Sequence, residues 1–382
     1  MKKINNKKKQ VGIGCFHIKL DEQGPGSYLK KLKEVLEAIP SINNIEISDS
    51  GFYKGGFLPI NENIEDNVET FDSGTGFYPS FSNAKVSFDV FIPQRIQKKI
   101  SPFNLYCESE NFKVAIYYTH IFTFTVVEPT KSIAEGEGSV SVVVIREFLK
   151  NEFDKCEEEI ELETLGPSPM HIDYELELKN KKFIQDNSDI FTTNLGIKIT
   201  KKKSYDLFRL YGDEEKITSL KNLKSILVRE LEDELSLYYL VMLSNTYELR
   251  LWDEIEDLMT NIRKAFGNKW WSIETKKYFV GKKIEKLFIK LSFFKQYRIS
   301  FKYLVKEKEK NILLNRESVI LKEYIDNELL DINDDVIEDS FGLVNFFDRK
   351  YSNYINNFYL VYSVILGGII GYFINLLIKT ST

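Results

Sequence analysis

The chain has few of the residues that most often bind metal ions or form disulfides. Of its 382 residues, three are cysteine and three are histidine. Cys15, Cys107 and Cys156 are odd in number and far apart, so they match neither a disulfide framework nor a CxxC metal knuckle. The scarcity of histidine argues against a histidine-rich metal site, and we expect no cofactor.

The chain also lacks a large excess of charge of one sign. The formal net charge is -5, although charged residues make up 29% of the chain. A general nucleic-acid binder usually carries a strong positive charge, so nucleic acid is not the expected partner. Hydrophobic residues make up 43%, which is enough for real cores and excludes wholesale disorder. The length is typical of two domains.

The familiar catalytic motifs are missing as well. The segment GIGCFH begins like a glycine-rich phosphate loop, but His17 stands where the third glycine of GxGxxG belongs. The sequence contains no GxxxxGK(S/T), HExxH or GxSxG motif and no HRD/DFG pair. These absences favour a protein that is not an enzyme.

Two weak constellations of nucleophilic residues remain. Cys15 and His17 lie two residues apart on a predicted strand. Side chains at this spacing point the same way but usually do not form the hydrogen bond that a nucleophile needs from its base. A buried cysteine beside an incidental histidine is the simpler interpretation. In the turn GPSPMHID, two prolines hold Ser168, while His171 and Asp173 share a strand face. This corner is a candidate catalytic or ligand-contacting site, and a stiff turn with outward polar residues is the simpler interpretation.

Only one long stretch without charge stands out, near the C-terminal end. Residues 358–378 read FYLVYSVILGGIIGYFINLLI, which is 21 residues without a charge. At about 1.5 Å per residue, a helix of this length matches a hydrocarbon core of ~30 Å, so the pattern predicts a transmembrane helix. Gly367 and Gly371 form a GxxxG pair, which lets two membrane helices approach closely and predicts a homo-oligomer.

The start of the chain indicates a topology for this helix. Its first ten residues carry five lysines, but the apolar run VGIGCFHI that follows is too short for a secretory signal. We therefore expect a tail-anchored, single-pass membrane protein, with the N-terminus and the bulk of the chain in the cytoplasm. The lipid bilayer is then one of its partners.

The remaining periodicity predicts an α+β fold. We expect a basic tail over residues 1–10, a mixed α/β sensing or binding domain over 11–212, and a helical stalk over 213–350 before the membrane helix. The sharpest strand signal lies in residues 160–178, where apolar and acidic residues alternate on both sides of the proline turn. This pattern predicts a hairpin with one acidic face, neutralised by the lysines of NLGIKITKKK.

Two segments of opposite charge lie in the helical part. Residues 276–306 hold nine lysines and Arg298 against Glu285, and residues 317–339 hold nine acids against Lys322. The simplest interpretation is an antiparallel hairpin in which the two segments neutralise each other. A surface for anionic lipid and a nucleic-acid contact are the alternatives. The residues proposed for this basic face are Lys282, Lys286, Lys290 and Arg298.

The leading functional hypothesis follows from this architecture. The α/β domain senses a small-molecule ligand or a cytoplasmic protein and couples it through the helices to the membrane span. Such a design suits an effector in bacterial stress or anti-phage responses, which is an architectural analogy. A membrane-tethered hydrolase using the 165–175 turn and a passive membrane adaptor are the alternatives.

Overall fold

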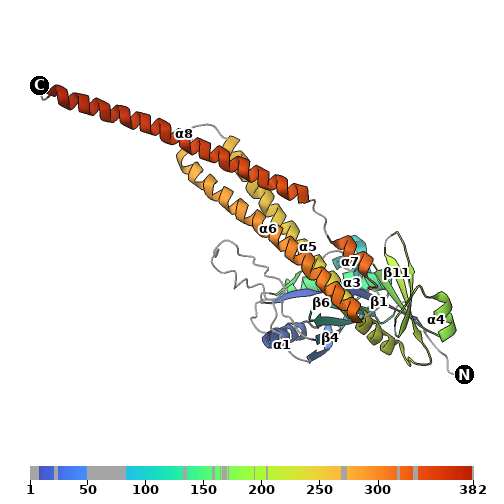
Figure 1. Ribbon diagram of the computed structural model, residues 1–382. Coiled ribbons are helices and arrows are strands. Elements are labelled where there is room, and N and C mark those ends of the chain that lie inside the picture. The colour runs from blue at the N-terminus through green and yellow to red at the C-terminus, as the bar shows by residue number, and fades with distance from the viewer. Residues whose placement is uncertain are drawn as a thin grey trace. The chain divides into compact units, whose positions relative to one another are not determined.

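The computed structural model shows a mixed α/β part followed by long helices (Figure 1). This confirms the coarse fold class, an N-terminal sheet domain with a helical region after it. The structure describes residues 8–20, 25–49, 83–131, 136–156, 160–163, 165, 170, 172–192, 194–203, 205–267, 273–315, 319–329 and 334–380.

A nine-stranded sheet forms the frame of the domain, with the strand order β3-β4-β5-β6-β1-β8-β11-β10-β9. All neighbouring strands are antiparallel except β8 and β11, which are parallel. A second, two-stranded sheet pairs β2 with β7. The strands are β1 (Lys8–Gly14), β2 (His17–Leu20), β3 (Ile42–Asp49), β4 (Asn83–Phe91), β5 (Asn111–Thr119), β6 (Thr123–Pro129), β7 (Ile160–Glu163), β8 (Ile172–Lys179), β9 (Ile190–Phe191), β10 (Leu195–Thr200) and β11 (Asp206–Asp213).

Short helices and one longer helix accompany the sheet. The longer one, α3, runs over Glu137–Phe153 and packs closely on the central strand β1. A Cβ at Gly138 would lie 2.6 Å from the carbonyl oxygen of Val11, so this contact requires a residue without a side chain. The others are α1 (Pro25–Glu37), α2 (Gln94–Ile100), the 3-10 helix η1 (Pro102–Asn104) and α4 (Lys181–Asn187).

One apolar core joins α1 and α3 to strands β4, β5 and β6. Alternate residues of β4, from Ala84 to Val90, point into it, and the intervening residues are partly exposed. This is the period of two that a strand with one buried face requires. The core gives the sheet a rigid framework for the polar contacts described below.

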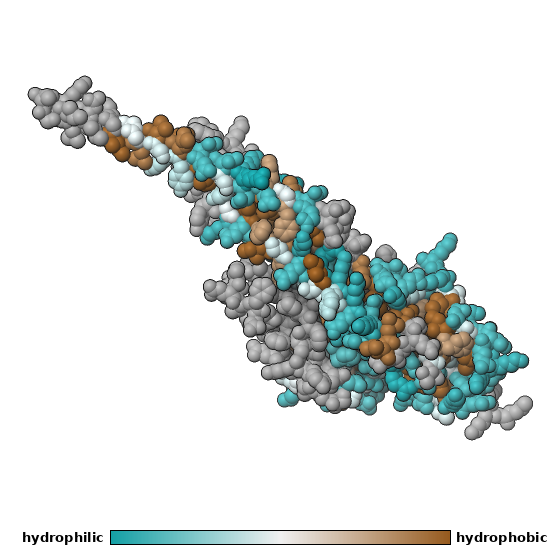
Figure 2. All heavy atoms as spheres, in the orientation of Figure 1, coloured by the Kyte–Doolittle hydropathy of each residue, from teal (hydrophilic) through white to brown (hydrophobic). Residues whose placement is uncertain are grey.

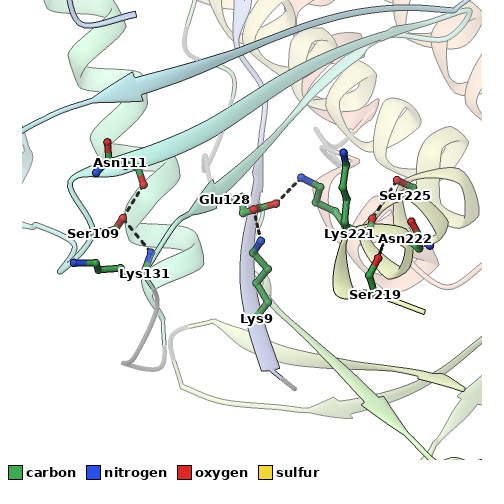
Figure 3. Close-up of polar contacts among 10 residues, drawn as sticks. Lys9, Ser109, Asn111, Glu128, Lys131, Ser219, Lys221, Asn222 and Ser225 are labelled. Atoms are coloured by element: carbon green, nitrogen blue, oxygen red, sulfur yellow. Dashed lines mark hydrogen bonds and ion pairs between the residues drawn. The ribbon is translucent and has the colours of Figure 1, made fainter. Parts of the chain in front are cut away.

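A carboxylate on β6 links the sheet to the start of a helix that comes later in the chain. Glu128 is buried, and one of its oxygens binds the ammonium group of Lys9 on β1 (Figure 3). Its other oxygen binds the ammonium group of Lys224 on α5 (Leu220–Gly267). Burial alone would raise the pKa of Glu128, but the two lysines lower it below its ordinary value. The ion pairs therefore tie β6, β1 and α5 together.

From Leu220 onward, the described residues are mainly helical. After α5 come α6 (Ile273–Asn315), the short α7 (Lys322–Glu328) and α8 (Asp334–Thr380). The chain divides into two compact units, residues 1–246 with 305–329 and residues 247–304 with 330–382. The unit boundaries fall inside α5 and α6, so each of these helices contributes residues to both units.

The second unit is a bundle of helices with its own apolar core. Leu251 and Ile255 of α5, Leu287 and Leu291 of α6, and Val344 of α8 are among its buried residues. Helices α5, α6 and α8 lie side by side here (Figure 1). The apolar spacing of three to four residues accounts for this packing.

The transmembrane prediction is wrong. Among the described residues, no helix is long and apolar enough to cross a membrane. The apolar run is part of the 47-residue helix α8, whose preceding turns carry Asp348, Arg349 and Lys350. The described side chains of the run end at Ile370 and include the hydroxyl of Ser363. The tail-anchored, single-pass membrane location, with the bulk of the chain cytoplasmic, is withdrawn with it.

The predicted acidic hairpin is also wrong. Strand β7 pairs with β2, and β8 lies between β1 and β11. The buried carboxylate of Glu175 on β8 binds Lys8 of β1 and Arg209 of β11, with Arg209 Nε 2.9 Å from Glu175 Oε2. The neutralising cations therefore come from the neighbouring strands rather than from NLGIKITKKK, because β10 is not adjacent to β8.

Candidate functional site around helix α7

Helix α7 is held at its first turn by a buried carboxylate from α5. Glu234 is 0% exposed, and its Oε2 accepts a hydrogen bond from the backbone N–H of Leu321 at 2.6 Å. Leu321 is the N-cap residue of α7 and supplies no capping side chain of its own. Glu234 satisfies one of the N–H groups that a helix start leaves without an intrahelical partner.

The last turn of α7 is held by the same helix. Asn245 donates its side-chain N–H to the carbonyl oxygen of Glu328 at 2.5 Å. The hydroxyl of Tyr238 donates to the carboxylate of Glu328 at 3.4 Å. Both ends of α7 therefore bind α5, through residues that all belong to the first compact unit.

A third set of contacts joins the middle of α7 to the sheet. The hydroxyl of Tyr324 donates to Asp206 Oδ2 at 2.5 Å, and its ring packs edge-on against Phe208 with centroids 5.9 Å apart. Lys201 Nζ lies 3.1 Å from Asp206 and 3.1 Å from Glu323. Ile325, which belongs to α7, is fully buried.

The charges of this set favour the docked state of α7. Burial alone would raise the pKa of Asp206, but hydrogen bonds from Tyr324, the Lys202 N–H and Lys201 lower it. Burial and the bond to Asp206 raise the pKa of Tyr324, so its hydroxyl keeps the proton that it donates. The carboxylate and the phenol are therefore complementary at neutral pH.

Sequence reasoning did not find this site. The contacts join α7 to residues far away in the chain, which no local pattern shows. One usable signal was Glu234 itself, a carboxylate within the apolar stripe that runs from Leu231 to Leu235. A charge in such a stripe is buried with a partner or points away from the core.

Of the three candidate residues in the predicted catalytic corner, the structure describes Asp173. Ser168 and His171 lie outside the described residues. Asp173 Oδ1 accepts hydrogen bonds from the backbone N–H of Ser139 at 3.1 Å and from its hydroxyl at 2.5 Å. Asp173 thus caps the first turn of α3, which is a structural task for this carboxylate.

The Cys15 and His17 pair lies in the interior. Cys15 is 1% exposed and donates its thiol hydrogen to the carbonyl oxygen of Thr123 at 3.4 Å. Burial and the nearby Glu163 raise the pKa of Cys15 well above its ordinary value. Burial and the nearby Lys19 lower the pKa of His17 to about 3, so its imidazole is neutral. The pair offers neither a thiolate nor an exposed base.

Two of the four residues of the predicted basic face are buried and form ion pairs. Lys290 is buried and binds Glu254, and Arg298 is buried with its Nε 3.3 Å from Glu248 Oε2. Both partners lie on α5 rather than in the acidic segment, and from that segment Glu338 pairs with Lys295 of α6. Lys282 is exposed and Lys286 is half-buried on α6.

The predicted glycine pair lies in α8. No atom of the described residues comes within 4 Å of a Cβ built at Gly367. Gly371 is also helical, and the side chains that the structure describes in α8 end before it, at Ile370. Within the described residues, no group of three or more histidine, cysteine, aspartate or glutamate side chains is placed to hold a metal ion.

Comparisons with known proteins identify no family for this chain. No family model matches it, and no curated protein matches it. Among solved structures it is similar to the toxic C-terminal tip of CdiA from Pseudomonas aeruginosa in complex with an immune protein, with 11% identity and a TM-score of 0.18. That alignment covers 41% of this chain and 87% of the other.

Proposed function

We propose that this chain is a sensing protein, in which a ligand or protein bound by the sheet domain changes the packing of the helical bundle. The observation that supports the proposal is the position of α5. This single 48-residue helix belongs to the sheet unit up to Thr246 and to the bundle unit from Tyr247. It also binds both ends of α7, the short helix that precedes α8 in the chain.

The polar contacts of α7 suit a switch better than an apolar interface would. A buried hydrogen bond to a charged group contributes about 1.5–3 kcal/mol, and leaving the charge without its partner costs more. The docked and released states of α7 are therefore distinct rather than continuous. A ligand that shifts β11 or α5 changes the balance between them, provided that it binds the two states with different affinity.

The test is hydrogen exchange on the full chain with α7 loosened. Tyr324→Phe removes the bond to Asp206 while keeping the ring against Phe208. We expect exchange to rise about tenfold in α7 and also in the first turns of α8, because the two are coupled. Tyr303→Phe is the matched control, since Tyr303 is 71% exposed on α6, and it leaves both segments unchanged. A rise confined to α7 would overturn the coupling.

The hydrolase hypothesis has no specific observation in its favour, since Asp173 caps α3. The membrane effector and membrane adaptor hypotheses depended on the span. Coupling between the sheet domain and the helices needs no membrane span.

A further inference from the structure

Helix α8 has two parts with different surroundings. In its first part, Ile337, Val344 and Phe347 are at most 5% exposed and belong to the core of the bundle. In the part after Phe358, nine large apolar side chains are between 40% and 67% exposed. They are Tyr359, Leu360, Val361, Tyr362, Val364, Ile365, Leu366, Ile369 and Ile370. We call residues 359–370 the apolar end of α8.

The apolar end extends past the neighbouring helices of its own bundle. Figure 1 shows this end of α8 continuing alone, and Figure 2 shows hydrophobic residues gathered on it before the uncoloured tip. Side chains of this size at these exposures present roughly 1,000 Å² of apolar surface. The largest apolar patch on a monomer is usually about 300–600 Å², so this surface is expected to be covered.

The distribution of these side chains restricts what covers them. Successive helix residues are rotated by about 100°, so residues 359–362 already point in four well-separated directions. All four are more than half exposed. A helix that binds one groove of a partner shows anchors on one side and polar residues on the other. The apolar end has no such polar side, so it needs neighbours on more than one side.

Copies of the same chain meet this requirement. The sequence contains no charge between Tyr351 and Ile378, so two such surfaces have nothing to repel and need no complementary charge. A standard interface takes about 800 Å² from each partner, which the apolar end can supply. At Gly367 and Gly368 no neighbouring atom of the described residues comes within 4 Å of a built Cβ, which leaves room for close approach of another backbone.

We propose that the apolar end of α8 is a self-association surface, on which α8 helices from further copies of this chain pack in parallel. Each copy contacts at least two others through residues 359–370, and the bundle of each chain stays outside the assembly. This surface is independent of the coupling through α7, so either proposal can fail without the other.

The first experiment measures the mass of the full chain in solution by light scattering across a range of concentrations. We expect a defined oligomer for the wild type. The double variant Ile365→Arg, Ile369→Arg places charges on the apolar end and should weaken association at least about tenfold. The control is Ile299→Arg, because Ile299 is also an isoleucine on an exposed helix face, at 63% exposure, but lies on α6. An equal loss in the control would overturn the proposal.

A second experiment locates the contact. Ser363→Cys introduces an exposed thiol on the apolar end, whereas Ser300→Cys places one on the exposed face of α6. Under mild oxidation, we expect a covalent dimer for the first variant only. The native cysteines lie elsewhere, two of them buried.

In a third experiment, the wild-type full chain is mixed with neutral phosphatidylcholine vesicles, and the vesicles are sedimented. Monomeric protein that binds vesicles through the apolar end would show that lipid, not a second copy, covers this surface. Aggregates without a defined mass, or dimers equally abundant with Ser300→Cys, would also overturn the proposal.

Discussion

The carboxylate of Glu234 and the backbone N–H of Leu321 are joined across two helices, at 2.6 Å and without exposure to solvent. A helix normally receives its N-terminal cap from the residue just before it. Here the cap belongs to α5, so α7 keeps its first turn only while it stays on α5. Formation of the short helix and its docking are therefore a single event.

This relationship gives the first prediction. Glu234→Ala leaves the Leu321 N–H buried without its acceptor, and we expect the free energy of unfolding to fall by about 2–4 kcal/mol. Glu234→Gln keeps an acceptor in the same place and should lose about half as much or less. Denaturant unfolding of the three proteins measures the difference. Equal loss in both variants would mean that volume, rather than the hydrogen bond, is what matters.

Docking of α7 should weaken in acid. The pKa of Asp206 is lowered in the folded chain relative to its ordinary value. A group whose folded pKa is depressed contributes stability above its unfolded pKa, and that stability is lost as pH falls through the folded pKa. We expect exchange of α7 amides, referred to the α3 amides, to rise below about pH 4. Asp206→Asn should abolish that dependence, and a dependence that persists in the variant would contradict the assignment.

The helical bundle should respond to pH in the opposite sense. Burial raises the pKa of Glu248 to about 7, although Arg298 and Lys302 act against the shift. A raised folded pKa gives stability that is complete below the unfolded pKa and is lost as pH rises through the folded value. Unfolding of the bundle should therefore become easier between about pH 5 and 8.

Two glutamine variants check this assignment. Glu248→Gln should flatten the dependence, because the amide does not titrate. Glu254→Gln is the control, since the Glu254 side chain is 57% exposed although it binds the neighbouring Lys290. A flat profile in the wild type would show that the ion pair with Arg298 outweighs burial.

Two glycines offer a matched pair of alanine substitutions. At Gly138 a Cβ would lie 2.6 Å from the Val11 carbonyl oxygen, so Gly138→Ala should push α3 from the sheet and cost about 1–3 kcal/mol. At Gly342 in α8, no described atom lies within 4 Å of a built Cβ, so Gly342→Ala should stabilise its helix by up to about 1 kcal/mol. Thermal unfolding separates the two, and a loss at Gly342 would contradict the packing of α8.

Local patterns predicted much of the secondary structure. The alternation of apolar and polar residues in AKVSFDVFI predicts a strand, and the structure has β4 there. The leucine spacing of three to four residues after Ser219 predicts a helix, and the structure has α5 there. The β-branched segment SVSVVVI after Gly138 is compatible with either a strand or a helix. It forms α3, whose Gly138 packs directly against the backbone of Val11 on β1. That choice depends on a contact with Val11, which local periodicity does not contain.

Strand pairing and the site around α7 lay beyond local patterns for the same reason. The residues 160–163 and 172–178 are neighbours in the chain, yet each strand pairs with distant partners. The ion pairs of Glu175 on β8 with Lys8 and Arg209 stabilise that arrangement. The apolar run at the end of α8 was recognised from the sequence, whereas its interpretation as a membrane span was wrong.

The order of the two units along the chain has a consequence for synthesis. The sheet unit needs residues 305–329, which follow the α5 and α6 residues of the bundle. Val305, Ile312, Leu321 and Ile325 are buried residues of this late segment. During synthesis on the ribosome, the core of the sheet unit therefore stays incomplete until residues 247–304 of the bundle and then residues 305–329 have been made. A nascent chain stalled before residue 305 exposes the apolar face of α5 and is a natural substrate for chaperones.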